Sequence, residues 1–389
     1  MPRCAEGADS LSVATILRDH VASLRLSPEQ GKAAAHIMAC RTGRLGGHFA
    51  VCDRCGSKHF AYDSCRDRHC PRCGGLDQAI WAEAQLQHLL PVSYYHLVPT
   101  VPLSLRPFFR GEGRAHAFDA LFAAVSETIL EVAARMGVCL GVLAVLHTWT
   151  QLLGDHPHIH CLVPGGGFDS EGRFVLMPRF LMSYRRLRVV FKIKLLQKLR
   201  RLVKEGVLSL GRASAYQLLD DADSREWNLK VKRAMRGPEE VIRYFARYTR
   251  RIAISDSRLV SYDGTTVTFR YRDRRNGNRS ELERVDGRTF CRRFLNHVLP
   301  QRFVRIRRYG ILSNRSREKR LKAARDALGQ EAPPLLTKES RSAACLRIFG
   351  EDPARCPECH EGRLVTLVRW TATIRPMDIV RAELAARAP

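Results

Sequence analysis

Two Cys-x-x-Cys pairs constrain the fold of this chain more than any other local feature. Cys52 and Cys55 form the first pair, and Cys70 and Cys73 form the second, with fourteen residues between the pairs. Each pair makes a tight turn that directs two thiolates at one ion, and four thiolates complete a tetrahedral zinc site. The spacing therefore predicts a structural Zn²⁺ site built from both pairs.

The same segment contains enough further metal-ligating residues for a second zinc ion. These residues are Cys40, His48 and Cys65, with His59 or His69 as a fourth group. Near the C-terminus, Cys356-Pro-Glu-Cys359 is half of a zinc site, to which Cys345 could add a ligand. Thirteen cysteines grouped in this way, in a long chain without a leader, indicate metal binding in a reducing compartment rather than a disulfide framework.

The charge balance points to a polyanionic partner. Sixty-five Lys and Arg stand against 39 Asp and Glu, which gives a formal net charge of +26. Nucleic acid is the first candidate partner for such a chain, and its 389 residues suggest two or three domains. The longest apolar run, residues 138–146, is far shorter than the roughly 20 residues of a membrane span. We therefore expect a cytoplasmic, DNA-associated protein with no membrane partner.

Two strongly basic segments predict DNA-binding surfaces. Residues 179–204 hold ten Lys or Arg and no acid, with apolar residues at helical spacing, and residues 302–325 hold ten Lys or Arg against one acid. A charge run is usually a solvated face, but a helix of this length without a compensating carboxylate favours contact with DNA. The cations that we expect at DNA in these segments are Arg185, Arg186, Lys192, Arg305 and Arg308.

A pair of histidines lies in a strand pattern near the middle of the chain. His158 and His160 are separated by one apolar residue, so both side chains point to the same face of a β-strand and could share one metal ion. The residues just before this strand include Gly, Asp and Pro, which favour a chain reversal. If the two flanking segments pair as an antiparallel hairpin, His147 could join the pair as a third ligand.

Two tyrosines four residues apart provide candidate nucleophiles. Tyr244 and Tyr248 follow Pro238 in a segment of helical character, which would place both hydroxyls on one face about one turn apart. Arg243 and Arg247 adjoin them and could hold phosphate and favour phenolate over phenol. Taken alone, the two tyrosines fit core aromatics; beside a histidine pair they become candidate catalytic residues.

The pattern along the chain predicts an α+β fold. We expect a helix that begins at Ser27-Pro28, a β-hairpin turn at Asp263-Gly264 and an acidic loop over residues 220–226. The remaining expected helices cover residues 78–90, 114–136 and 179–204. The expected strands cover residues 94–98, 138–149, 159–163 and 173–177, of which the second and third form a central pair.

The motifs, taken in order, resemble a known family. They are CRTGRLGGH, SCRDRHCPRC, HTW, HPHIHCLVPGGG, YFARYTRRIAIS, FLNHVLP and CPEC. This order is similar to that of the two-tyrosine transposases of the HUH endonuclease superfamily, which move insertion sequences by a rolling-circle route. The resemblance implies a helical and zinc-binding domain over residues 1–90. It further implies an HUH-like catalytic domain over 91–270, with a central antiparallel sheet flanked by helices, and a basic C-terminal region over 271–389.

The resemblance also implies a catalytic cation. His158 and His160 match the histidine pair that holds a divalent cation in this family, usually Mg²⁺ or Mn²⁺. Related relaxases use a further histidine on the neighbouring strand, which favours His147 as the third ligand. Asp155 and His156 remain alternatives for that position.

The nucleophiles that the resemblance implies are Tyr244 and Tyr248. Their attack on a phosphodiester would leave a 5′-phosphotyrosine link and a free 3′-hydroxyl, without need of ATP. Because attack requires an extruded strand, the expected substrates are single-stranded DNA or hairpin element ends. Two other functions stay open, namely a plasmid relaxase or replication initiator with the same chemistry, and a non-catalytic zinc-dependent DNA-binding protein.

Overall fold

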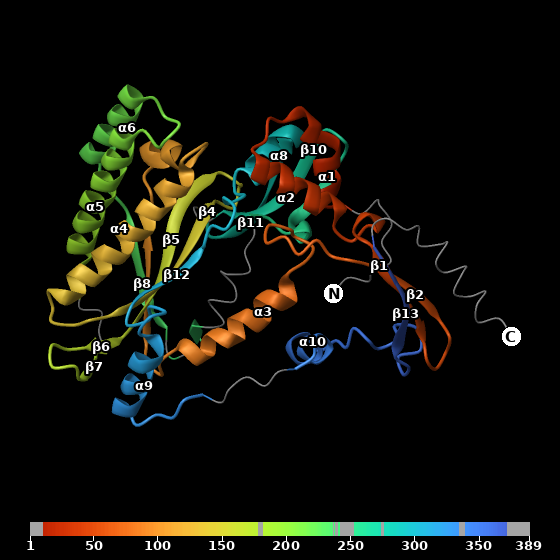
Figure 1. Cartoon of the computed structure of the whole chain (residues 1–389). Helices are drawn as coiled ribbons and strands as arrows, with labels where there is room; N and C mark the ends of the chain where they lie inside the picture. The colour runs from red at the N-terminus through yellow and green to blue at the C-terminus, as the bar shows by residue number, and fades with distance from the viewer. Residues whose placement is uncertain are drawn as a thin grey trace.

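The computed structural model describes residues 11–177, 182–235, 237, 240–241, 253–273, 276–333 and 339–371. These residues form an α+β protein built around a five-stranded antiparallel sheet (Figure 1), as the sequence predicts. In spatial order its strands are β12 (Ile306–Gly310), β4 (Gly141–Trp149), β5 (Asp155–Pro164), β3 (Tyr94–Pro99) and β8 (Leu229–Met235). The expected central pair is confirmed as the β4–β5 hairpin.

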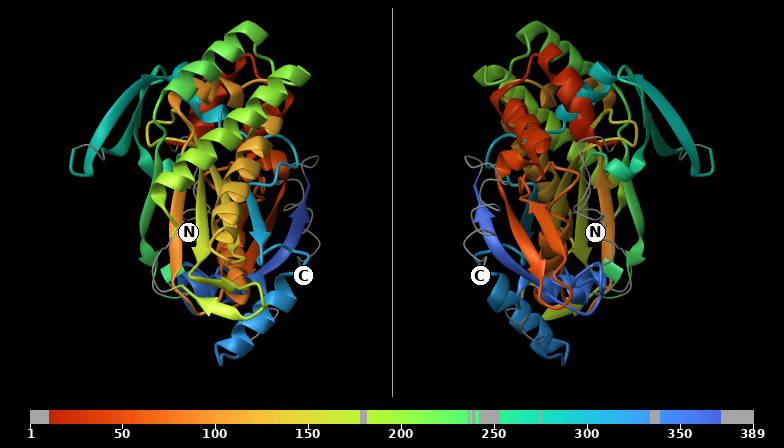
Figure 2. Two further views of the ribbon diagram at one scale, coloured as in Figure 1. Left: turned by 90° about the vertical axis from the view of Figure 1, so that its left-hand side faces the viewer. Right: turned by 90° about the vertical axis from the view of Figure 1, so that its right-hand side faces the viewer.

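A layer of helices covers one face of this sheet (Figure 2, left). Alternate strand residues such as Leu97, Leu146 and Ile159 point into this layer and form the largest apolar core with it. The layer consists of the 3₁₀ segment η4 (Leu103–Phe109) and the helices α4 (Arg114–Ala134), α5 (Tyr184–Glu205) and α6 (Arg212–Ser224). The prediction of an acidic loop over residues 220–226 is wrong for residues 220–224, because these residues belong to α6.

The opposite face of the sheet carries a second apolar core. Tyr94, Val145 and Leu162 project from the strands and are buried there together with Val241. The covering elements include α3 (Gly75–Ala84), the 3₁₀ segment η3 (Gln85–His88) and α9 (Arg317–Ala327). The small hairpin of β6 (Gly166–Phe168) and β7 (Phe174–Leu176) contributes Phe168.

A third core joins the beginning of the chain to its second half. Side chains of α1 (Val13–His20) and α2 (Pro28–Ala39) are buried against a three-stranded sheet and a helix. Those partners are β9 (Leu259–Tyr262), β10 (Thr266–Asp273), β11 (Arg279–Asp286) and α8 (Gly287–Leu295). The predicted helix start at Ser27-Pro28 is confirmed, with a capping box between Ser27 and Gln30. The predicted hairpin turn is confirmed between β9 and β10.

A separate small sheet joins a strand of the N-terminal region to the last described strand. Strand β13 (Leu364–Trp370) pairs antiparallel with β1 (Gly47–Cys52), which also pairs with β2 (Lys58–Tyr62). In Figure 1 these strands lie side by side although they come from opposite ends of the sequence, and α10 (Arg341–Phe349) precedes β13. The short 3₁₀ segments η1 (Val21–Ser23), η2 (Gly43–Leu45) and η5 (Asp256–Arg258) complete the described elements. Within the described ranges, no helix combines the length and apolarity needed to cross a bilayer.

Candidate active site and metal centres

The β4–β5 hairpin brings three histidines together on one face of the central sheet. His147 stands directly opposite His158 in the strand register, and His160 follows two residues further along β5. A tight connection fixes this register, because the Thr150 N–H donates to the Gly154 carbonyl at 2.9 Å and the Gly154 N–H donates to Thr150 Oγ1 at 3.0 Å. The three imidazoles project from the face opposite α4 and α5.

The spacing of these imidazoles fits a single cation. One nitrogen from each of His147, His158 and His160 lies within 4.8 Å of the others, and the Nε2 atoms of His158 and His160 are 3.1 Å apart. Two ligands at right angles about a metal and 2.1 Å from it would be about 3.0 Å apart. All three histidines are at least nine-tenths buried. The arrangement therefore suits a shared ion better than three independent, solvated side chains.

A fourth histidine, His96, contacts this group through His160. It projects from β3, is fully buried, and places its Nε2 2.9 Å from Nδ1 of His160. On His158 the corresponding Nδ1 lies 2.6 Å from the carbonyl oxygen of His156, to which it donates. These two contacts hold the Nδ1 side of both rings, so the Nε2 atoms face each other. The sequence analysis missed His96, whose only signal was a single histidine in an otherwise apolar strand.

The two other candidates for the third ligand are engaged elsewhere. Asp155 accepts a hydrogen bond from Nε of Arg110 at 2.5 Å, and Nδ1 of His156 lies 2.9 Å from a guanidinium nitrogen of Arg106. Arg106 and His156 line a cavity of about 320 Å³ at the beginning of β5, together with residues of the 225–228 loop. Of the three alternatives, the structure thus brings only His147 into the group with His158 and His160.

The predicted nucleophiles, Tyr244 and Tyr248, lie outside the described residues, and so do Arg243 and Arg247. The described residues that flank this stretch in the sequence are Val241 and Ala253, and both are buried. Val241 belongs to the apolar core on the histidine face of the sheet.

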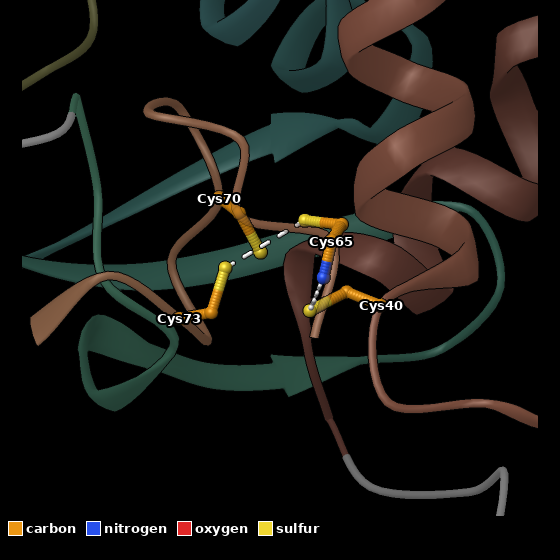
Figure 3. A group of neighbouring side chains, drawn as sticks. All are labelled: Cys40, Cys65, Cys70 and Cys73. Carbon is orange, nitrogen blue, oxygen red and sulfur yellow. Dashed lines mark hydrogen bonds between the residues drawn. The ribbon is translucent and has the colours of Figure 1, made fainter. Parts of the chain in front are cut away.

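The cysteines form two four-sulfur groups, and their division differs from the predicted one. Cys70 and Cys73 group with Cys40 and Cys65 rather than with the first Cys-x-x-Cys pair (Figure 3). The sulfurs of Cys65 and Cys73 are 3.6 Å apart, and the Cys65 N–H donates to Cys40 Sγ at 3.5 Å. Hydrogen bonding from the Cys65 thiol lowers the pKa of Cys40, while the same contact raises the pKa of Cys65. A bound cation would allow all four thiols to ionise together.

Cys52 and Cys55 group instead with the two cysteines of the C-terminal CPEC motif, Cys356 and Cys359. The prediction of one site from residues 52, 55, 70 and 73 is therefore wrong. The reason is that β1 and β2 extend between the two pairs and hold them apart, while β13 brings the C-terminal motif to Cys52.

The histidines proposed as zinc ligands belong to neither four-cysteine group, although His59 Nε2 lies 3.9 Å from Cys356 Sγ. His48 lies on β1, and its buried Nδ1 finds no hydrogen-bond partner within the described part of the chain. His69 lies 3.0 Å from Asp67 Oδ1 and accepts from the Leu299 N–H, and Nε2 of His59 lies 3.0 Å from the Ser57 hydroxyl. The site that was predicted to contain His48 with Cys40 and Cys65 is instead completed by Cys70 and Cys73.

The basic helix α5 is compensated by acids from its neighbours, contrary to the sequence analysis. Lys192 pairs with Asp223 of α6 at 3.3 Å, whereas Arg185 and Arg186 are exposed at the start of the helix. Other cations of α5 form ion pairs with Glu127, Glu131, Asp220 and Glu226. Residues 179–204 contain no acid, but acids from other segments neutralise many of their cations. In addition, α5 covers the face of the sheet that is opposite to the histidines.

The second basic segment approaches the histidine group more closely. Arg308 projects from β12 on the same sheet face as Val145 and contacts the amide of Gln85. Arg305 lines a small cavity with Trp149, whose ring stacks on His147 at 4.8 Å between centroids. Burial, and to a lesser extent a neighbouring arginine, lower the pKa of Arg305 to about 10. Both arginines therefore remain candidates for phosphate contact.

Comparisons with known proteins agree with this architecture. A family described as "Putative transposase" matches residues 141–320, which contain the histidine hairpin, and a family described as "Transposase zinc-binding domain" matches residues 13–101. The chain is 40% identical to "Putative transposase y4qJ" of Sinorhizobium fredii over 88% of its length and 90% of that protein. It is 28% identical to the "Transposase for insertion sequence element IS801" of Pseudomonas savastanoi pv. phaseolicola, over 90% and 86% of the two chains. No solved structure matches the chain significantly.

The fold, the histidine group and these relatives define a DNA-acting transposase that carries cysteine groups suited to structural zinc. More specifically, the chain belongs to the two-tyrosine insertion-sequence transposases of the HUH superfamily with an N-terminal zinc-binding domain.

Proposed function

We propose that this transposase cuts and rejoins single-stranded DNA at the ends of its element, through a covalent tyrosine intermediate in rolling-circle transposition. The observation that carries the proposal is the buried group of His147, His158 and His160 on one sheet face, with ligand nitrogens within 4.8 Å of one another. Such a group in a DNA-acting protein is suited to hold a cation against a phosphodiester. A bound divalent cation would polarise the scissile phosphate and offset its charge.

The donor set favours Mn²⁺ over Mg²⁺ as that cation. Mg²⁺ prefers oxygen ligands and retains its water, whereas imidazole nitrogen binds transition metals more strongly. His147, His158 and His160 supply three imidazoles, and the contacts at Nδ1 of His158 and His160 leave both Nε2 atoms for the ion. We therefore infer that cleavage depends on a divalent cation and is fastest with Mn²⁺.

Tyr244 and Tyr248 are the proposed nucleophiles. The tyrosine oxygen forms a bond to phosphorus as the bond from phosphorus to the 3′-oxygen breaks, and the 3′-oxygen takes up a proton. The second tyrosine can make a second cut or accept strand transfer.

The cavity at the start of β5 offers a path for the strand that is cut. It is lined by Arg106 and His156 and adjoins His158, whose ring centroid is 5.0 Å from that of His156. Its lining is mostly apolar but includes the guanidinium groups of Arg106 and Arg225, which suit a nucleotide phosphate. A duplex would have to open before its backbone could reach histidines that are almost fully buried on one face of the sheet, which favours single-stranded or hairpin substrates.

Cleavage and binding by one histidine variant test the proposal. His158→Ala should abolish Mn²⁺-dependent cleavage of a single-stranded oligonucleotide that carries the element's end, while retaining most of its affinity for that strand. The matched control is His116→Ala, an exposed histidine on α4 behind the opposite face of the sheet, which should cleave like the wild type. Cleavage by His158→Ala at the wild-type rate would refute the assignment of the histidine group.

A further inference from the structure

We propose that Cys52, Cys55, Cys356 and Cys359 bind a second structural zinc ion, which fastens the C-terminal segment to the N-terminal zinc-binding domain. The matched zinc-binding family covers residues 13–101 and therefore contains only half of these ligands. The proposal concerns the architecture of the chain and does not depend on the catalytic chemistry proposed above.

The sulfur positions match a tetrahedral zinc site. Cys52 Sγ is 3.7 Å from Cys359 Sγ, and Cys55 Sγ is 3.8 Å from Cys356 Sγ. All four sulfurs lie within 4.8 Å of one another. Sulfurs that are 2.3 Å from one zinc ion at tetrahedral angles are about 3.8 Å apart. The four thiols could therefore bind an ion with little movement of the chain.

Backbone groups are arranged to stabilise thiolates at both pairs. Cys52 Sγ accepts hydrogen bonds from the N–H groups of Arg54 and Cys55, at 3.4 and 3.5 Å. Cys359 Sγ accepts from the Gly362 N–H at 3.3 Å. Each Cys-x-x-Cys turn thus directs N–H dipoles at a sulfur, an arrangement that favours the ionised form that a metal requires.

Hydrogen bonds beside the four cysteines hold the Cys356–Cys359 turn against the Cys52–Cys55 turn. The Asp53 N–H donates to the Arg363 carbonyl at 3.0 Å, and the Arg363 N–H donates to Asp53 Oδ1 at 2.8 Å. Gly362 lies so close to Cys52 that a Cβ on it would be 2.3 Å from the sulfur. Beyond these turns, β13 continues alongside β1 as far as Gly47 (Figure 2, right). The contacts at the four cysteines therefore continue directly into the pairing of β1 with β13.

The small sheet has too little apolar core to hold the C-terminal strand alone. Its cluster of buried residues consists of Phe49 and Trp370, with three half-buried residues packed against them. Modules of this size usually need a metal or disulfides, and structural zinc contributes on the order of 10–16 kcal/mol to the folding of comparable modules. A zinc ion shared by β1 and the CPEC turn supplies this stabilisation where β13 joins the N-terminal strands.

Metal analysis of the purified full-length protein tests the proposal. The His158→Ala background is used so that the histidine group does not contribute to the zinc count. In that background we expect two zinc ions per chain, and one after Cys356→Ser or Cys359→Ser. The control Cys139→Ser, an exposed cysteine outside both groups, should keep two. One zinc per chain in the background protein, or two in Cys359→Ser, would overturn the proposal.

Two further measurements keep the test decisive if a serine variant does not fold. Cys359→His in the same background offers a replacement ligand and should restore two zinc ions per chain. The intact mass of the denatured, unreduced background protein tests the alternative chemistry of the same four cysteines. A mass equal to that of the fully reduced chain agrees with zinc thiolates, whereas disulfides linking Cys52 or Cys55 to the C-terminal pair would contradict the proposal.

Discussion

His96 is expected to control the affinity of the histidine group for its cation without touching the cation. Nε2 of His96 lies 2.9 Å from Nδ1 of His160, and both side chains are buried. When Nε2 of His160 binds a metal, its Nδ1 carries the proton, and this N–H donates a hydrogen bond to Nε2 of His96. In His96→Leu, metal binding would leave this N–H buried without an acceptor, which costs about 1–3 kcal/mol. Mn²⁺ affinity should therefore fall by roughly 10- to 100-fold.

Calorimetric titration of the metal-free histidine site with Mn²⁺ measures this effect. His96→Gln provides the matched variant, because its amide oxygen can accept the His160 proton and should restore most of the affinity. Thermal unfolding of the same samples without Mn²⁺ separates a loss of affinity from a loss of the fold. A folded His96→Leu variant that binds Mn²⁺ within two- to threefold of the wild type would refute the positioning role of His96.

Three further predictions concern the framework of the molecule. Gly362→Ala should release about one zinc per chain, because the added Cβ would lie 2.3 Å from Cys52 Sγ; a full metal complement would contradict this. Gly31→Ala in α2 has no atom within 4 Å of the new Cβ and should stabilise the protein by roughly 0.5–1 kcal/mol in denaturant unfolding. Burial and nearby arginines lower the pKa of His88 to about 4, so the neutral form is favoured in the folded state. Above the unfolded pKa near 6.5 His88 is neutral in both states, and as pH falls from 6.5 to 4 the unfolded state takes up a proton that the folded state resists, so stability is lost over this range. His88→Gln should therefore lose less stability than the wild type between pH 7 and 5; equal losses would argue against it.

The local patterns of the sequence are sufficient to predict the histidine hairpin. Residues 141–149 and 155–164 are β-rich and joined by turn formers, and alternation across the pleat places His158 and His160 on one face. His147 depends on the register, which the tight Thr150–Gly154 connection fixes. The strands and helices of the central layers could likewise be predicted, because their apolar periodicity reflects burial on one side.

Features that depend on distant contacts could not be predicted. The 14-residue spacing between the Cys-x-x-Cys pairs fits one zinc site, yet β13 brings Cys359 to Cys52 from 307 residues away. The carboxylates that neutralise α5 come from α4 and α6, so a count within the segment missed them. His96 reaches His160 only through the pairing of β3 with β5. Each of these errors reflects a pairing between elements that no short pattern encodes.

The proposed mechanism requires that tyrosine forms a covalent link to the 5′ side of the cut strand. It is tested most directly by incubating the protein and Mn²⁺ with single-stranded DNA from the element's end, labelled at either its 3′ or its 5′ terminus. We predict that only the 3′-labelled strand yields labelled protein on a denaturing gel, and that the 5′-labelled strand releases a free fragment. The adduct should disappear when Tyr244→Phe and Tyr248→Phe are combined. An adduct formed by that double variant, or one that carries the 5′ label, would contradict the proposed mechanism.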